Sequence, residues 1–276
     1  MKSITFALAG LAVAVSTAFS GAATAGETLD RITDDGVLRV ATDANWAPQS
    51  FLNDNNEMDG FDVDVAREIG KRLGVEVEFV TPAWDIITAG NWRGRWDLSV
   101  GSMTPTSTRA EVLDFPAVYY YTPAAVAIHK DSDAKSFDDL TGKRIGATTA
   151  SVFELYLQKD LQIDAQGVPA FEYQVDGKIN SYKDSTAALD DLRLGNGVRL
   201  DAMVGSLPAI LAARKSGYPI EILGAPVFYE PLALAIDKGD AELNEKLAGI
   251  VADMRDEGVL KALSEKWYGI DYTSIN

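Results

Sequence analysis

Short strand-like segments alternate with longer helical ones along this chain, and this alternation constrains the fold more than any other feature. Residues 37–41 form an apolar run typical of a strand, whereas apolar side chains in 65–73 recur at helical spacing and stop at Gly74. Residues 75–79 alternate between apolar side chains and glutamates, which is strand periodicity. Further strands are expected at 98–101, 124–128, 144–147 and 202–205, and further helices at 151–161, 185–194, 207–215, 241–255 and 259–268. This order predicts an α/β protein with mostly parallel sheets.

The N-terminus has the composition of a secretory signal peptide. Lys2 supplies a positive charge, residues 4–15 are almost entirely apolar or small, and Ala23-Thr24-Ala25 forms a cleavage site of the A-x-A type. A membrane anchor is the alternative, but the apolar run is shorter than the roughly 20 residues that a span requires. We therefore expect residues 1–25 to be removed and the mature protein to be free in the periplasm.

Charge and residue counts exclude several classes of function. The chain carries 25 Lys and Arg against 41 Asp and Glu, a net charge of −16, which disfavours a nucleic-acid-binding surface. It has no cysteine and one histidine, His129, so cysteine nucleophiles, disulfides and ordinary Cys/His metal sites are excluded. We expect no metal, no cofactor and no catalytic residues.

Motifs distributed over the chain carry a family resemblance. Residues 37–51 read VLRVATDANWAPQSF, residues 60–66 read GFDVDVA, residues 96–109 read WDLSVGSMTPTSTR, and residues 266–269 read KWYG. In this order they resemble the family-3 extracellular solute-binding proteins of ABC transporters, which include the periplasmic receptors for polar amino acids. The resemblance covers essentially the whole mature chain.

The resemblance implies a two-lobed periplasmic-binding-protein fold of type II, which closes on a ligand in the cleft between its lobes. It implies a discontinuous lobe one, residues 26–122 and 230–276, to which the C-terminal helices return. Lobe two would comprise residues 123–229, with hinge crossings near Tyr121–Ala125 and Phe228–Ala233. The expected partners are a small-molecule ligand and an ABC permease in the inner membrane, and the receptor itself is expected to be a monomer.

Arg109 is the expected anchor of the ligand. It follows the strand at 98–101 and lies among hydroxyl-bearing residues, and a guanidinium beside such donors forms a two-pronged seat for a carboxylate. By resemblance, Ser102, Thr104 and Arg109 occupy positions that contact the ligand in the family. Without this motif, an arginine in an acidic protein would suit a surface salt bridge.

Aromatic and acidic residues complete the expected pocket. By resemblance, Trp46 and Trp84 match positions whose rings enclose the ligand side chain, although aromatic residues outside this context are more often part of a core. Asp43 matches an acid found in relatives that bind cationic amino acids, and a turn-forming aspartate is the equal alternative.

Ser151 is expected at a helix N-terminus. Glu154 follows three residues later, which is a capping-box pattern, so a structural N-cap is one interpretation. The other is that this N-terminus offers N–H groups and positive dipole to a ligand carboxylate. Where the family usually has Gly-Thr-Thr at this turn, the chain has Ala150-Ser151-Val152.

Ser206 departs from the family pattern. The amino-acid receptors of the family carry a carboxylate there, which pairs with the ligand ammonium. A serine could cap the helix that starts at Leu207, but it cannot neutralise an ammonium buried in a closed cleft. Either Glu230, near the second crossing, or Asp43 replaces the missing acid, or the ligand lacks a free α-ammonium. An ordinary loop glutamate is the alternative for Glu230.

The sequence thus predicts a periplasmic receptor of an ABC importer that captures a small polar carboxylate, an amino acid or a derivative. An enzyme similar to cyclohexadienyl dehydratases, which share the family's fold, is one alternative. An accessory protein of a quinoprotein dehydrogenase is the other. The absence of an obvious acid–base pair around Ser206 disfavours the enzyme, and the intact Ser102, Thr104 and Arg109 motif favours a small ligand over a partner protein.

Overall fold

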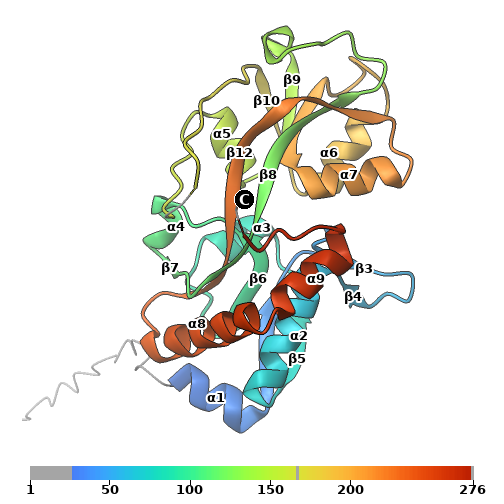
Figure 1. Cartoon of the computed structure of the whole chain (residues 1–276). Helices are drawn as coiled ribbons and strands as arrows, with labels where there is room; N and C mark the ends of the chain where they lie inside the picture. The colour runs from blue at the N-terminus through green and yellow to red at the C-terminus, as the bar shows by residue number, and fades with distance from the viewer. Residues whose placement is uncertain (1–26, 166–167, 275–276) are drawn as a thin grey trace, which may run out of the picture.

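Two long strands connect two lobes that lie one above the other (Figure 1). The structure, a computed structural model, describes residues 27–165 and 168–274. The connecting strands are β8 (Val118–His129) and β12 (Ile220–Asp237). They lie at the centre of a nine-stranded sheet with the order β10-β9-β11-β8-β12-β6-β1-β5, in which β7 also pairs with β12. The predicted two-lobed α/β fold with two crossing strands is confirmed.

Each lobe is assembled from elements on one side of the crossing. Lobe one contains the elements before β8 and the two helices after β12: α1 (Glu27–Asp35), β1 (Val37–Ala41), β2 (Asn45–Trp46), β3 (Ser50–Leu52), β4 (Met58–Asp59), α2 (Phe61–Leu73), β5 (Glu76–Val80), α3 (Trp84–Thr88), β6 (Leu98–Met103), α4 (Ser107–Ala110), β7 (Leu113–Asp114), α8 (Ala241–Asp256) and α9 (Val259–Tyr268). Lobe two contains the elements between β8 and β12: the 3₁₀ helix η1 (Phe137–Leu140), β9 (Arg144–Thr148), α5 (Val152–Leu157), β10 (Lys178–Tyr182), α6 (Ser185–Leu192), β11 (Ala202–Ser206) and α7 (Leu207–Lys215). Strands β2, β3 and β4 form a separate small sheet in lobe one.

Strand direction in the large sheet differs from the sequence-based expectation of mostly parallel pairing. β1 is parallel to β5 and β6, and β9 is parallel to β10 and β11. β12, however, is antiparallel to β6, β7 and β8, and β8 is antiparallel to β11. The expectation is wrong for these central strands because β8 carries the chain into lobe two and β12 carries it back, so the two run in opposite directions.

The lobes bury separate apolar cores, and both long strands pass from one core to the other near their middle. Tyr120 of β8 and Leu232 of β12 pack in the core of lobe one with side chains of α2, α8 and α9. Ala124 and Phe228 pack in a core of lobe two with side chains of β9 and α5. Each lobe is therefore stabilised by its own hydrophobic core. The predicted lobe boundaries fall between Tyr120 and Ala124 on β8 and between Phe228 and Leu232 on β12, and they stay a prediction.

Most predicted helices and strands are confirmed, with differences at their ends. The helix expected at 151–161 ends at Leu157, where α5 stops, and the strand expected at 124–128 is the second part of the longer β8. Sequence periodicity predicted neither the helices α1, α3, α4 and η1 nor the strands β7 and β10 nor the small β2-β3-β4 sheet. These elements are short or strongly charged, so their apolar periodicity is weak.

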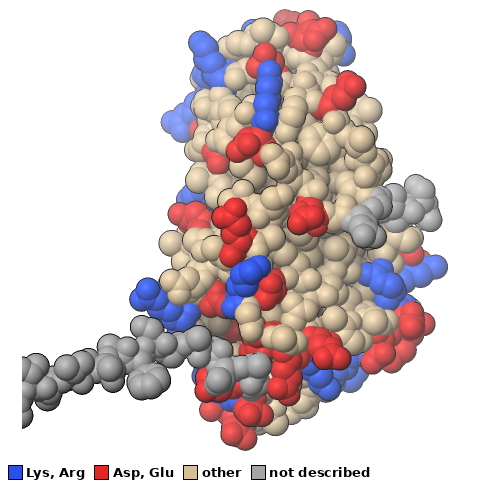
Figure 2. Space-filling view, turned by 90° about the vertical axis from the view of Figure 1, so that its left-hand side faces the viewer, with Lys and Arg blue, Asp and Glu red and all other residues tan. Residues whose placement is uncertain are grey.

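The predicted signal peptide, residues 1–25, lies outside the described residues. Within residues 27–165 and 168–274, no helix is both long enough and apolar enough to cross a membrane. On the face in Figure 2, acidic side chains gather at the end of lobe one, with lysines and arginines interspersed and no broad basic patch.

The glycine that begins α2 has a geometry that other residues cannot adopt. Gly60 has a φ of 127° and a ψ of 176°, and a Cβ atom there would lie 2.3 Å from the carbonyl oxygen of Gln49. Beside it, the backbone N–H groups of Phe61 and Asp62 donate to the carbonyls of Pro48 and Gln49 at 3.1 and 2.9 Å. This close approach fixes the first turn of α2 and places Asp62 in the interior, with no exposed surface.

Replacing Gly60 with alanine should therefore destabilise the protein strongly. The alanine would combine a glycine-only backbone conformation with a steric overlap, and we expect a loss of about 3 kcal/mol or more in the free energy of unfolding, measured by urea denaturation. Gly36→Ala is the matched control, because Gly36 also has a positive φ, 68°, but an added Cβ would meet nothing within 4 Å. That control should lose about 1–2 kcal/mol. Equal losses in the two variants would contradict the proposed role of the close approach.

Candidate ligand-binding site

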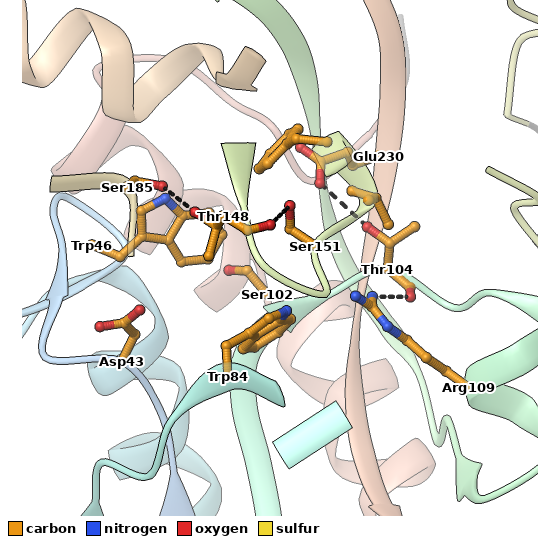
Figure 3. Close-up of a pocket in the computed structure, with 12 residues that line it drawn as sticks. Asp43, Trp46, Trp84, Ser102, Thr104, Arg109, Thr148, Ser151, Ser185 and Glu230 are labelled. Atoms are coloured by element: carbon orange, nitrogen blue, oxygen red, sulfur yellow. Dashed lines mark hydrogen bonds between the residues drawn. The ribbon is translucent and has the colours of Figure 1, made fainter. Parts of the chain in front are cut away.

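A pocket with about 420 Å³ of empty space, part of which is open to solvent, lies where the lobes meet beside the crossing strands (Figure 3). Its wall combines lobe one, lobe two and β12. The lining residues are Asp43, Trp46, Trp84, Ser102, Thr104 and Arg109 from lobe one, Thr148, Ser151, Val152, Phe153 and Ser185 from lobe two, and Glu230 from β12. All the site residues predicted from the sequence except Ser206 are therefore brought together around one cavity.

Arg109 is a buried cation at this wall. The side chain of Thr106 accepts a hydrogen bond from the backbone N–H of Arg109, which caps α4 and orients the arginine. Its guanidinium donates to the carbonyl of Thr104 in lobe one and to that of Ala150 in lobe two, both at 2.8 Å, and lies 5.5 Å from the centre of the Trp84 ring. Arg109 is only 5 % exposed, and no carboxylate of the described residues lies within ion-pair distance of it. Burial lowers the pKa of Arg109 to about 10, and the nearby Glu230 opposes this shift.

Glu230 is a buried carboxyl group at the same end of the cavity. It lies on β12 opposite Thr122 of β8 and is 2 % exposed. The hydroxyls of Thr104 and Thr122 donate to its two carboxyl oxygens, each at 3.3 Å. Burial raises the pKa of Glu230 to about 8, although the two threonine hydrogen bonds and the charge of Arg109 act in the opposite direction.

The two buried groups do not form an ion pair with each other. A buried charge without a partner is costly, and such groups are concentrated at functional sites. A cation and an acid that face one cavity can together receive a ligand that carries both an anionic and a cationic group. This arrangement is the strongest chemical feature of the cavity.

Two indole rings form the next part of the wall. In Figure 3, Trp46 and Trp84 lie between Asp43 on one side and Arg109 and Glu230 on the other. The indole N–H groups of both tryptophans are buried without a hydrogen-bond partner among the described residues. Asp43 accepts a hydrogen bond from the N–H of Asn45 at 2.7 Å, so it also forms the turn considered as its alternative role. Burial raises the pKa of Asp43.

The N-cap interpretation of Ser151 is confirmed. Its hydroxyl accepts a hydrogen bond from the N–H of Glu154 at 3.3 Å and donates to the carbonyl of Thr148 at 2.6 Å. The Glu154 carboxylate accepts from the N–H of Ala150 at 2.7 Å, one residue before the position expected in a capping box. Because the hydroxyl proton is used within the turn, the hydroxyl of Ser151 has no donor left for a ligand.

Ser206 lies outside the cavity lining and makes a different contact. Its hydroxyl accepts a hydrogen bond from the Gln49 side-chain amide at 3.1 Å, across the two lobes, and both side chains are buried. Ser206 occupies the N-cap position of α7, but its side chain makes none of the capping hydrogen bonds that a serine could make there. The Ser206 hydroxyl instead accepts a hydrogen bond from Gln49 of lobe one.

Four lining residues were not predicted from the sequence: Thr148, Val152, Phe153 and Ser185. Thr148 ends β9, and Ser185 begins α6 just after the neighbouring β10; their hydroxyls lie 3.2 Å apart. The carboxyl ends of adjacent parallel strands are the usual place for ligand-contacting residues, so these two could have been found had β10 been recognised. Val152 and Phe153 look like core residues in the sequence and offered no such signal.

Comparisons with known proteins agree with this architecture. The family model described as "Bacterial extracellular solute-binding proteins, family 3" matches residues 38–270. An L-cystine-binding protein of Escherichia coli strain K12 is 29% identical over 248 residues, which cover 89% of this chain and 87% of the relative. A probable amino-acid ABC transporter-binding protein of Haemophilus influenzae is 30% identical over 280 residues, which cover 99% of this chain and 100% of the relative.

A solved structure is also similar over most of its length. It is the crystal structure of an ancestral amino acid-binding protein described as a precursor of cyclohexadienyl dehydratase, with 31% identity and a TM-score of 0.76. The match covers 87% of this chain and 99% of that one. The family match spans well over half of the chain, in the order in which the sequence motifs occur. The chain therefore belongs to the bacterial extracellular solute-binding proteins of family 3.

Proposed function

We propose that this protein is the solute-binding receptor of an ABC importer and that it captures an amino acid between its lobes. The observation that carries the proposal is the pair of buried, unpaired groups, Arg109 and Glu230, at one end of the cavity. The relatives, which are named as amino-acid-binding and ABC transporter-binding proteins, support the same class of ligand. The membrane partner would be the permease of that importer.

The α-carboxylate and α-ammonium of the ligand would bind at this end. Arg109 has donors beyond the two that bond to backbone carbonyls, so it can hold a carboxylate by two hydrogen bonds. Glu230 would lose its proton and pair with the ammonium, in place of the acid that Ser206 does not supply. Both ligand charges would then be neutralised inside the closed cleft.

The ligand side chain would extend between the indoles toward Asp43. Trp46 and Trp84 offer flat faces for an apolar, planar or cationic group. Asp43 lies beyond them at the far end of the cavity, where it would accept hydrogen bonds from a polar side-chain end (Figure 3).

Lobe closure would complete the site. We infer that the lobes move about the crossings near Tyr121–Ala125 and Phe228–Ala233, with lobe one formed by residues 26–122 and 230–276 and lobe two by 123–229. Removal of residues 1–25 would release a periplasmic monomer. Hydrogen bonds between the lobes, such as the one from Arg109 to Ala150, support a closed arrangement of the present structure.

An enzyme is the second candidate, because a similar solved structure is described as a precursor of cyclohexadienyl dehydratase and because Glu230 holds a proton near neutral pH. A carboxylic acid in such a state could act as a general acid. We favour the non-enzymatic receptor, since the named relatives are binding proteins. Dehydration of a cyclohexadienyl substrate by the purified protein, lost in Glu230→Gln, would instead support the enzyme.

Arg109→Ala should abolish most of the ligand affinity. Removing one member of a buried charge pair costs about 2–5 kcal/mol, so the dissociation constant should rise roughly thirtyfold or more. Calorimetry with the standard amino acids and L-cystine would measure this, with Arg199→Ala as the control, because Arg199 is an exposed arginine whose side chain is 67% accessible. A wild-type protein that binds none of these ligands would contradict the proposed function.

Glu230→Gln should weaken binding of an α-amino acid but not of its deaminated analogue. The variant keeps the shape and loses the charge that pairs with the ammonium. Because a bound ammonium favours the ionised carboxylate, and the free group has a pKa of about 8, the wild-type affinity for the amino acid should rise with pH up to that value. The variant should lack this part of the rise.

Glu221→Gln is the matched control for Glu230→Gln, since Glu221 lies on the same strand, β12, but is exposed and does not line the cavity. Titrations of one amino acid and its deaminated analogue against both variants would decide the assignment. If only Asp43→Asn lowered the affinity for the amino acid, the ammonium would bind at Asp43 instead. Equal affinity of the wild-type protein for the amino acid and its deaminated analogue would exclude recognition of an α-ammonium.

A further inference from the structure

A buried carboxyl group lies directly behind the cavity wall and has no part in the binding mode above. Asp62, in the first turn of α2, has no exposed surface, and its Oδ2 lies 2.7 Å from the hydroxyl of Ser102, a lining residue. Its Oδ1 accepts a hydrogen bond from the hydroxyl of Tyr119, also at 2.7 Å. The Tyr119 oxygen accepts from the N–H of Ser102 at 3.0 Å, and Tyr120 contacts the Ser102 hydroxyl.

These contacts hold Ser102 in an unusual conformation. Ser102 has a φ of 52°, in the left-handed region that residues other than glycine seldom occupy. Strain of this kind persists only where surrounding contacts fix the residue, and it is concentrated at binding sites. Here Asp62 and Tyr119 bind both the side chain and the backbone of Ser102, so its position at the wall is fixed from behind.

When Asp62 is ionised, the hydrogen-bond donors and acceptors around it can be arranged in only one way. An ionised Asp62 only accepts hydrogen bonds, so the protons of Ser102 and Tyr119 both point to it. Tyr120 must then donate to the Ser102 oxygen, because the single hydroxyl proton of Ser102 is already used. The Ser102 oxygen keeps one lone pair, which can only accept a hydrogen bond from a ligand.

A protonated Asp62 reverses this arrangement. Its new O–H would donate to Ser102 or to Tyr119, and the displaced hydroxyl proton would have to point elsewhere. If Asp62 donates to Ser102, the serine proton becomes free to donate to a ligand. In that arrangement, protonation of Asp62 changes Ser102 from a hydrogen-bond acceptor into a donor toward the ligand, whereas ionised Asp62 keeps it an acceptor.

The groups that face Asp62 are phenols. Tyr119 and Tyr120 approach from β8 and Tyr268 from α9, and burial raises the pKa of all three well above the usual value, so they stay neutral. No lysine or arginine in the described part of the chain forms an ion pair with Asp62, whereas Asp64 on the same helix faces outward to Lys266. Burial raises the pKa of Asp62 to about 7, while the hydrogen bonds from Ser102 and Tyr119 oppose this shift.

We propose that Asp62 is a positioning residue that holds the Ser102 hydroxyl as a hydrogen-bond acceptor for the ligand's amino group. The ammonium would bind Glu230 directly and would donate a second hydrogen bond to the Ser102 hydroxyl. That hydroxyl in turn donates to the buried carboxylate of Asp62. This inference rests on the proposed function. It gives Ser102 a role different from the carboxylate donor expected from the sequence.

The first test is Asp62→Asn, an uncharged variant of nearly the same shape. It should weaken binding of an α-amino acid about tenfold, the value of one hydrogen bond to a charged group, and leave the deaminated analogue within about twofold. A purely structural role of Asp62 would weaken both ligands equally, and that outcome would overturn the proposal. A wild-type protein that binds no amino acid would instead refute the proposed function.

The second test uses the pH dependence of affinity in a Glu230→Gln background, where the titration of Glu230 is absent. Because the ligand's amino group favours ionised Asp62, the remaining affinity for the amino acid should rise as the pH increases through about 7. Adding Asp62→Asn should flatten this rise, while Asp43, which also titrates at the cavity, is the same in both proteins. Identical profiles would overturn the proposal.

Tyr119→Phe extends the test to a protein that retains Asp62. The variant removes one hydrogen bond that stabilises the carboxylate, so the pKa of Asp62 should rise and the pH profile should move to higher pH. This shift would be measurable even if Asp62→Asn failed to fold. An unmoved profile with intact folding would show that Asp62 does not carry the titration and would overturn the proposal.

Discussion

β8 and β12 pair in antiparallel register through both lobes, from His129 opposite Ile220 to Val118 opposite Ala233. This pairing joins the lobes, and Thr122 and Glu230 near its middle belong to neither apolar core. There Thr122 lies opposite Glu230, so the register places a carboxyl group between the lobes. The position of the candidate site therefore follows from the strand pairing, and the lobes supply its walls.

The cavity keeps ionisable groups where water is scarce, and this lowers the stability of the ligand-free closed form. Arg109 and Glu230 both have pKa values shifted by burial toward their neutral forms. A carboxylate and an ammonium that arrive together would reverse both shifts, because each restores an opposite charge to its buried partner. A ligand with only a carboxylate or only an ammonium would pair with either Arg109 or Glu230 and would leave the other buried group without a partner of opposite charge.

The fold and most of the site could be predicted from the sequence because the signals are local. The strand at 37–41 and the helix that ends at Gly74 follow from periodicity, and Arg109 lies in a continuous motif with Thr104. The contact of Gln49 with Ser206 joins residues 157 positions apart, and the role of Asp62 depends on tyrosines from β8. Such contacts depend on tertiary packing, which periodicity and spacing do not specify.

Ser206 lies where the family resemblance implies an acid, and this difference would change which lobe recognises the ligand's charged groups. In the proposed binding mode, Arg109 and Ser102 belong to lobe one and Glu230 lies on β12 where it enters that lobe. Lobe two would then contribute mainly to closure, through the bonds from Gln49 to Ser206 and from Thr186 to the carbonyl of Asn45 at 2.8 Å. The ligand would first dock on lobe one, where its charged groups would be neutralised. Lobe two would then close over the ligand through hydrogen bonds between polar groups, without bringing a further charge into the cleft.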